Sequence, residues 1–133
     1  MKHLILYCSL FLLFISCNFK PCEKVTDKDV VGYYTSDNPA NKGKQYIRIL
    51  ENHTFIMAYC HSDSIIIEQG TWGRHDGCHV WLNGIRWFNI IGERDAEVPS
   101  YGSFIWVRGK LAMGEYIWSF QKTWRKPKLV CEK

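Results

Sequence analysis

Sequence motifs for several common reactions are missing from this chain. It has no Gly-x-Ser-x-Gly turn to present a serine nucleophile, and no Gly-x-x-x-x-Gly-Lys or Gly-x-Gly-x-x-Gly loop to hold a phosphate. Glu68 and Glu115 would act as a glycosidase pair only at a suitable separation, and such residues more often lie on the solvent face of a strand. We therefore predict no catalytic residues, no cofactor and a protein that is not an enzyme.

A strong charge of one sign and a long apolar run are also absent. The chain has 17 Lys and Arg against 13 Asp and Glu, and basic and acidic residues alternate between Lys20 and Asp29. The only basic run is residues 122–128, which is typical of a solvated tail. Nucleic-acid binders instead gather basic charge on one face, so we expect no nucleic-acid partner. The longest apolar run, residues 4–15, is too short to span a bilayer.

The first stretch of the chain predicts export. Lys2 gives a basic start, residues 4–15 give an apolar core, and Ser16 is a small residue just before a cysteine. This order is that of a secretory signal peptide, which is cleaved from the mature protein. Residues 1–16 are the predicted signal, and the mature part then carries 16 basic and 13 acidic side chains.

The end of this signal resembles the lipobox of bacterial lipoproteins. The residues that carry the resemblance are Leu13-Phe14-Ile15-Ser16-Cys17, in which Phe14 departs from the aliphatic residue usual there. The resemblance implies that the Cys17 thiol receives a lipid, labelled by palmitate, and becomes the new N-terminus. Asn18, which follows, resembles cargo sent to the outer membrane and facing the periplasm. We expect residues 17–29 to be the lipidated cysteine and a tether, and residues 30–133 to be one domain.

Short β-type runs separated by turn residues fill this domain, and no stretch keeps a helical period. Alternation is clear in residues 45–50, and Asn83-Gly84 between two β-rich runs predicts a hairpin with a type I′ turn. A last hairpin is expected around residues 109–114. About eight runs follow one another, namely 30–35, 45–50, 55–60, 65–72, 79–82, 85–88, 103–107 and 115–124. Eight antiparallel strands predict an all-β, up-and-down closed barrel.

The order of short motifs resembles small bacterial lipoproteins with lipocalin-like barrels. The motifs are Gly32-Tyr-Tyr in the first strand, Asn52-His-Thr-Phe in a hairpin and Gly70-Thr-Trp in a later strand. They cover about half of the domain. The resemblance implies a barrel that encloses one small ligand, or none.

Four cysteines remain after the signal and Cys17 are set aside: Cys22, Cys60, Cys78 and Cys131. An exported protein with an even number of cysteines is expected to form disulfides, and three pairings are open. Barrel closure brings the two ends of the domain together, which favours Cys22 with Cys131. Cys60 with Cys78 is the remaining pair, although the strand between them is about 25 Å long and a disulfide needs Cα atoms within about 7 Å.

Two clusters contain zinc-type ligands. They are Cys60-His61-x-Asp63 and His75-x-x-Cys78-His79, and neither has the spacing of a zinc finger. Because export favours disulfides over free thiolates, we predict no metal site and structural cysteines beside loop histidines.

Six tryptophans are many for a domain of this size. In a barrel, large aromatic side chains either fill the centre or line a cavity for a ring-bearing or apolar ligand. The predicted ligand-binding residues are Trp87, Trp106, Tyr116, Trp118 and Phe120. Two hypotheses follow. The first is a lipid-anchored, non-enzymatic barrel that binds a small or apolar ligand. The alternative is a protein-interaction module, an inhibitor or immunity-type lipoprotein that inserts loop 92–100 into an envelope partner.

Overall fold

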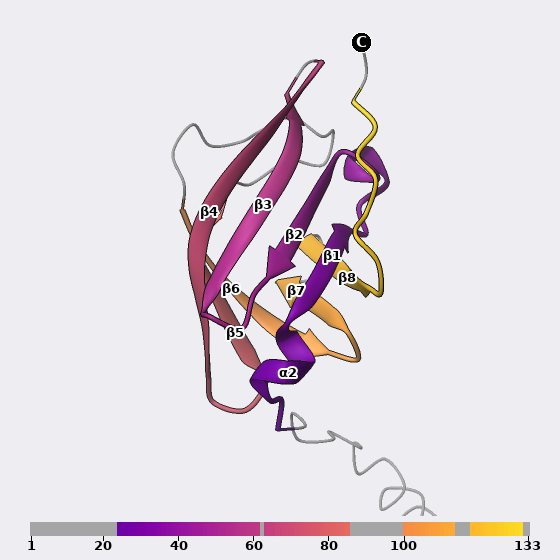
Figure 1. Cartoon of the computed structure of the whole chain (residues 1–133). Helices are drawn as coiled ribbons and strands as arrows, with labels where there is room; N and C mark the ends of the chain where they lie inside the picture. The colour runs from indigo at the N-terminus through magenta and orange to yellow at the C-terminus, as the bar shows by residue number, and fades with distance from the viewer. Residues whose placement is uncertain (1–23, 62, 86–99, 114–117, 132–133) are drawn as a thin grey trace, which may run out of the picture.

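The computed structural model describes residues 24–61, 63–85, 100–113 and 118–131, and these form a closed antiparallel barrel of eight strands in sequence order (Figure 1). The predicted all-β up-and-down barrel is confirmed. Strand β1 pairs with β2 on one side and with β8 on the other, which closes the sheet. The strands are β1 (Gly32–Ser36), β2 (Gln45–Ile49), β3 (Thr54–His61), β4 (Ser64–His75), β5 (His79–Ile85), β6 (Ser100–Val107), β7 (Lys110–Met113) and β8 (Trp118–Thr123).

Alternation along the strands builds the core inside the barrel. Tyr34 of β1 lies opposite Ile47 of β2, and Ile47 lies opposite Met57 of β3, so all three point inward. Each of the three has a solvent exposure of 0%. The same rule applies around the barrel because residues opposite each other on paired strands share a face. The largest fully buried side chains include Trp72, Tyr34, Tyr59, Phe55 and Phe104.

A short helix covers one end of the barrel. Helix α2 (Asp27–Val30) is preceded by Val25, and both Val25 and Val30 are buried in the core. Thr26 and Asp29 form a capping box that starts the helix. Val25, Thr26 and Asp29 belong to the predicted tether 17–29. The tether therefore does not run free up to residue 29, because Val25 already packs into the core. None of the described helices is long and apolar enough to cross a bilayer.

The predicted hairpin at Asn83-Gly84 is wrong. Both residues lie within β5, where the register shifts between Asn83, opposite Tyr101, and Ile85, opposite Ser100. Gly84 has a φ of 95°, so its positive angle serves a bulge instead of a turn. At this bulge β5 lies very close to β4. A Cβ added to Gly70 of β4 would lie only 2.3 Å from the main-chain oxygen of Asn83. Residues 86–88 of the predicted next strand lie outside the described residues.

The two-residue turn lies further along the chain, at Arg108-Gly109. Val107 pairs with Lys110 on either side of it, and Arg108 and Gly109 have φ angles of 50° and 80°. Two consecutive positive angles are what a type I′ turn requires. The turn opens β7, which the sequence analysis had placed in a loop. The number of strands is therefore correct, although β7 was not among the predicted strands and the predicted run 85–88 begins inside β5.

The C-terminal segment, residues 124–131, runs back along the barrel after β8 (Figure 1). The Val130 amide donates a hydrogen bond to the Gly43 carbonyl at 2.8 Å. Cys131 forms a disulfide with Cys60 at the end of β3, across 71 residues. Tyr46 and Ala58 pair in register on the outer face of β2 and β3, but their exposures are only 7% and 1%. We refer to residues 125–131 as the strap, because its two attachments fasten it beside this buried outer surface.

This disulfide corrects both predicted pairings. Cys131 is bonded to Cys60 and so is not bonded to Cys22. Cys78 is also disulfide-bonded, but not to Cys60. The reason is the length of β4, whose 12 residues hold Cys60 and Cys78 at opposite ends of the barrel. The strap, which the sequence analysis did not foresee, carries Cys131 to the Cys60 end.

Candidate functional site

A pocket of about 460 Å³ opens at the α2 end of the barrel. Its walls come from three segments that are distant in sequence: helix α2, the turn between β6 and β7, and the end of β8. The lining residues are Lys28, Asp29, Trp106, Arg108, Gly109, Gln121, Lys122, Thr123 and Trp124. Two indoles, three cations and one carboxylate thus surround the same space.

Trp106 is the fixed wall of the pocket. It lies on β6, packs against the core, and donates its indole N–H to the Tyr34 hydroxyl at 3.2 Å. Tyr34 in turn donates its hydroxyl proton to the Val30 carbonyl at 2.5 Å. Burial raises the pKa of Tyr34 above its ordinary value, so the phenol stays protonated and keeps this donor. The chain of two hydrogen bonds ties the indole to helix α2 through the interior of the barrel.

Trp124 is the exposed wall. Its relative exposure is 101%, the highest of the large apolar side chains in the described residues. It comes directly after β8, where the Thr123 hydroxyl donates to the Arg125 carbonyl at 2.9 Å and the chain turns into the strap. A fully exposed indole at the rim of a pocket is free to cover whatever enters.

Lys122 is the most enclosed cation of the pocket. Its alkyl chain passes over Gly32, where a Cβ would lie 2.8 Å from Lys122 Cε. The ammonium donates to the Asp29 main-chain carbonyl at 2.6 Å. Desolvation by burial lowers the pKa of Lys122, although the Asp29 carboxylate opposes this shift. The ammonium is therefore held in place, and it has lost part of its hydration.

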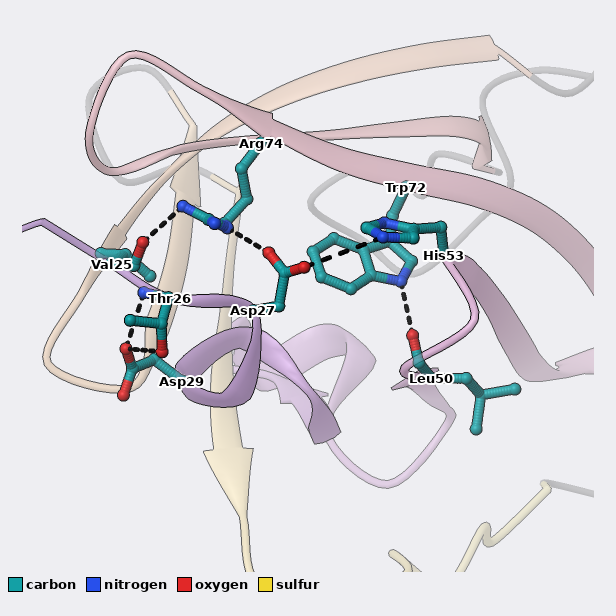
Figure 2. Close-up of polar contacts among 8 residues, drawn as sticks. All are labelled: Val25, Thr26, Asp27, Asp29, Leu50, His53, Trp72 and Arg74. Atoms are coloured by element: carbon teal, nitrogen blue, oxygen red, sulfur yellow. Dashed lines mark hydrogen bonds and ion pairs between the residues drawn. The ribbon is translucent and has the colours of Figure 1, made fainter.

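The carboxylate of Asp29 is already engaged. Both the amide and the hydroxyl of Thr26 donate to its Oδ2, at 2.7 and 2.6 Å (Figure 2). These hydrogen bonds lower the pKa of Asp29, the side-chain one most strongly, so the group is ionised at neutral pH. Its oxygens serve the helix cap, while its main-chain carbonyl serves Lys122.

The other two cations of the pocket are exposed. Lys28 lies on α2 and Arg108 on the type I′ turn. Within the described ranges, neither side chain has an ion-pair partner. The turn that carries Arg108 is fixed to β8, because the Lys122 amide donates to the Gly109 carbonyl at 2.7 Å.

A second polar cluster lies at the same end, around Asp27 of α2 (Figure 2). Arg74 of β4 donates to the Asp27 carboxylate at 2.5 Å and also to the Val25 carbonyl. His53 lies 3.7 Å from the same carboxylate, and its ring is 5.0 Å from that of Trp72. A histidine beside an aspartate needs a nucleophile to act as a triad, and the hydroxyl of Thr26 in Figure 2 donates to Asp29 instead. The cluster instead fastens α2 to the barrel.

Two of the predicted ligand-binding residues, Trp106 and Phe120, have described side chains, and they are placed differently. Trp106 lines the pocket, whereas Phe120 is a core residue at 2% exposure whose ring meets that of Phe104 edge-on. Trp118 pairs through its main chain with Met113 on β7. Trp87, Tyr116, Cys17 and the loop 92–100 (apart from the backbone of Ser100, which begins β6) lie outside the described residues.

The sequence-based prediction did not include the cations of the pocket or its exposed indole, namely Lys28, Arg108, Lys122 and Trp124. A signal for two of them was present in the basic run 122–128, which we interpreted as a solvated tail. Trp124 interrupts that run, and an indole among cations is unusual for a tail. Lys28 and Arg108 gave no signal, because only the closed barrel brings them to the same end.

In the two zinc-like motifs, two histidines stack on each other and both cysteines are in disulfides. His75 and His79 face each other across the β4–β5 hairpin with ring centroids 5.5 Å apart. Cys60 and Cys78 are in disulfides. Among the residues that the structure describes, no three potential metal ligands come together.

Comparison of the chain with models of protein families, with curated proteins and with solved structures gives no match.

Proposed function

We propose that this protein is a non-enzymatic binding domain, held by a lipid anchor in the bacterial cell envelope, whose pocket at the α2 end takes one small ligand. The observation that carries the proposal is the pocket of about 460 Å³ with two indoles in its walls. Pockets for small molecules typically measure about 300 to 1,000 Å³ and are lined by apolar and aromatic groups with a few polar ones.

The two indoles suit such a role in different ways. Trp106 is oriented before binding by its hydrogen bond to Tyr34, so a ligand that contacts it does not have to order it. Trp124 is fully exposed, so covering it removes a large apolar surface from water. A ligand with a planar or apolar part would benefit from both.

The centre of the barrel is a less suitable site among the described strands. Tyr34, Phe104 and Leu111 point inward next to the pocket, and none is more than 1% exposed. Side chains that are packed in this way leave no room for a guest without a large rearrangement. We therefore assign the ligand to the end of the barrel.

The test is native mass spectrometry of the full chain with Cys17→Ser, purified from a bacterial periplasm. Extra mass that leaves on denaturation would support binding and give the size of the ligand. We expect Trp124→Ala to reduce the occupied fraction. Trp81→Ala is the matched control, because Trp81 stacks on Tyr101 on the outer face of β5 and β6 and does not line the pocket. A bare mass in the parent together with no response to aromatic probes would contradict the proposal.

The lipid anchor is supported by the sequence around Cys17 and is tested separately. We expect the wild-type chain to incorporate radioactive palmitate and to sediment with the outer membrane. The Cys17→Ser variant is expected to lose the label and to appear in the soluble fraction. Continued labelling of that variant would refute the lipobox assignment.

A protein partner is the second candidate, and one surface favours it. Tyr101, Ile105 and Val107 project outward along β6, with exposures of 57%, 43% and 50%. A row of apolar side chains on an outer strand face is typical of a contact surface. A photo-crosslinker at Ile105 that captures one envelope protein in stoichiometric yield would support this role, and crosslinks spread over many proteins would count against it.

A further inference from the structure

The charges of the pocket do not balance. Lys28, Arg108 and Lys122 contribute three positive charges, and Asp29 contributes one negative charge. The Asp29 carboxylate oxygen that is hydrogen-bonded accepts from Thr26, so it is directed to the helix cap. Two positive charges are therefore left over around a space that is large enough for a ligand.

Lys122 holds part of this excess positive charge at a fixed place in the pocket. Its ammonium is held by the Asp29 carbonyl, which is a neutral acceptor, and its alkyl chain is fixed over Gly32. An ammonium that has lost water without gaining a direct carboxylate partner is stabilised by an incoming anion. Arg108 and Lys28 stand at the rim, where their charges attract such an anion from solution.

We propose that the pocket selects an anionic ligand, in which a carboxylate, sulfonate or phosphate adjoins a planar or apolar part. The anionic group would bind Lys122 and Arg108, and the apolar part would contact Trp106 and Trp124. This inference rests on the proposed function, since it names the class of ligand for the same pocket.

Two probes that differ by a single sulfonate test the inference. The full chain with Cys17→Ser is titrated with 8-anilinonaphthalene-1-sulfonate and, in parallel, with its neutral counterpart N-phenyl-1-naphthylamine. We expect the sulfonate to bind on the order of tenfold more tightly, which is the size of one charge-assisted contact. We also expect added salt to weaken the sulfonate and to leave the neutral probe unchanged, because salt screens partly exposed charges.

Variants assign the effect to the pocket. Lys122→Gln and Arg108→Gln are each expected to reduce the affinity for the sulfonate about fivefold or more and to leave the neutral probe unchanged. Lys42→Gln is the matched control, because Lys42 follows the 3-10 helix Pro39–Asn41 between β1 and β2 and does not line the pocket. Lys122→Gln loses the contact to Asp29, and this loss could impair folding. In that case Arg108→Gln still tests the inference, because Arg108 is exposed on a turn.

The outcomes separate the two proposals. Equal binding of both probes, with no effect of the lysine and arginine variants, would overturn the anionic class and leave the pocket as a ligand site. Failure of both probes, or binding that Trp124→Ala does not change, would overturn the proposed function and this inference with it. Tighter binding of the sulfonate that only the pocket variants weaken would support both.

The same chemistry occurs in lipid head groups and in free small acids, and a further arm distinguishes them. The pocket opens at the α2 end of the barrel, and Lys24 follows Cys17 by only seven positions in the chain, a reach of at most about 25 Å. We expect monomeric lysophosphatidylglycerol to displace the sulfonate probe if the source is a head group. Displacement by indole-3-acetate alone would assign the pocket to a free aromatic acid, and displacement by neither would count against the anionic class.

Discussion

The disulfide between Cys60 and Cys131 should contribute a large share of this domain's free energy of unfolding. It closes a loop of 71 residues, and the loop-entropy relation gives about 15 cal/mol/K for that length, or about 4 kcal/mol at 25 °C. Domains of this size are stable by only about 5 to 15 kcal/mol. Removing the bridge is therefore expected to cost between about a quarter and most of the free energy of unfolding.

The perturbation is the double variant Cys60→Ser with Cys131→Ser. A reducing agent is unsuitable, because it would also open the disulfide of Cys78. Urea unfolding followed by tryptophan fluorescence should show a midpoint well below that of the parent. The m value should rise, because the unfolded chain without the bridge exposes more surface.

A second readout separates the bridge from the strap. Without its covalent attachment, the strap keeps the hydrogen bond from Val130 to Gly43, and we expect it to detach more often. Trypsin should then cleave after Lys128 faster in the double variant than in the parent, at a urea concentration where both barrels stay folded. A loss of stability below about 1 kcal/mol with an unchanged rate of cleavage would refute the reasoning, since neither the unfolded state nor the strap would depend on the bridge.

Three further predictions concern single residues. Tyr34→Phe removes the hydroxyl that donates to Val30 and accepts from Trp106. We therefore expect urea unfolding to give a free energy of unfolding about 1 to 3 kcal/mol lower than that of the parent. Because burial raises the pKa of Tyr34, the unfolded chain ionises first above about pH 10; wild-type stability should therefore fall with rising pH more steeply than that of Tyr34→Phe. Gly70→Ala should lower the free energy of unfolding by more than about 2 kcal/mol, since the added Cβ would clash with the Asn83 main-chain oxygen. An unchanged melting temperature would contradict the close approach of the two strands. In an NMR titration of the lysine Cε carbons, Lys122 should titrate at a lower pH than the exposed lysines, because burial lowers its pKa.

The fold could be predicted because its signal is local and repeated. Strands β2 and β3 place alternate residues on the inner face of the barrel, and both were predicted from the sequence to within one residue or so of their observed bounds. Eight such runs in neighbour order favour a closed sheet, which buries the inner face and leaves no open edge. The predicted barrel followed from the number and order of these runs.

The hairpin prediction was wrong for a physical reason. Asn-Gly indicates positive φ angles, and Gly84 has one, but positive φ also suits a bulge. The bulge is favoured over the turn because Gly70 on the neighbouring strand allows β4 and β5 to approach closely at that point. Arg108-Gly109 forms the real type I′ turn, although arginine is not a residue that signals it.

The pocket could not be predicted, because none of its walls is a pattern in the sequence. Lys28, Arg108 and Lys122 are far apart in the chain, and each alone is an ordinary surface cation. Lys122 is the informative one: its alternation on β8 places it inward, opposite Tyr34, where a lysine would be costly in a packed core. Since the barrel ends there, the ammonium reaches the Asp29 carbonyl and the pocket instead. An inward-facing lysine near the end of the last strand therefore indicates the site, but only once the register of β1 and β8 is known.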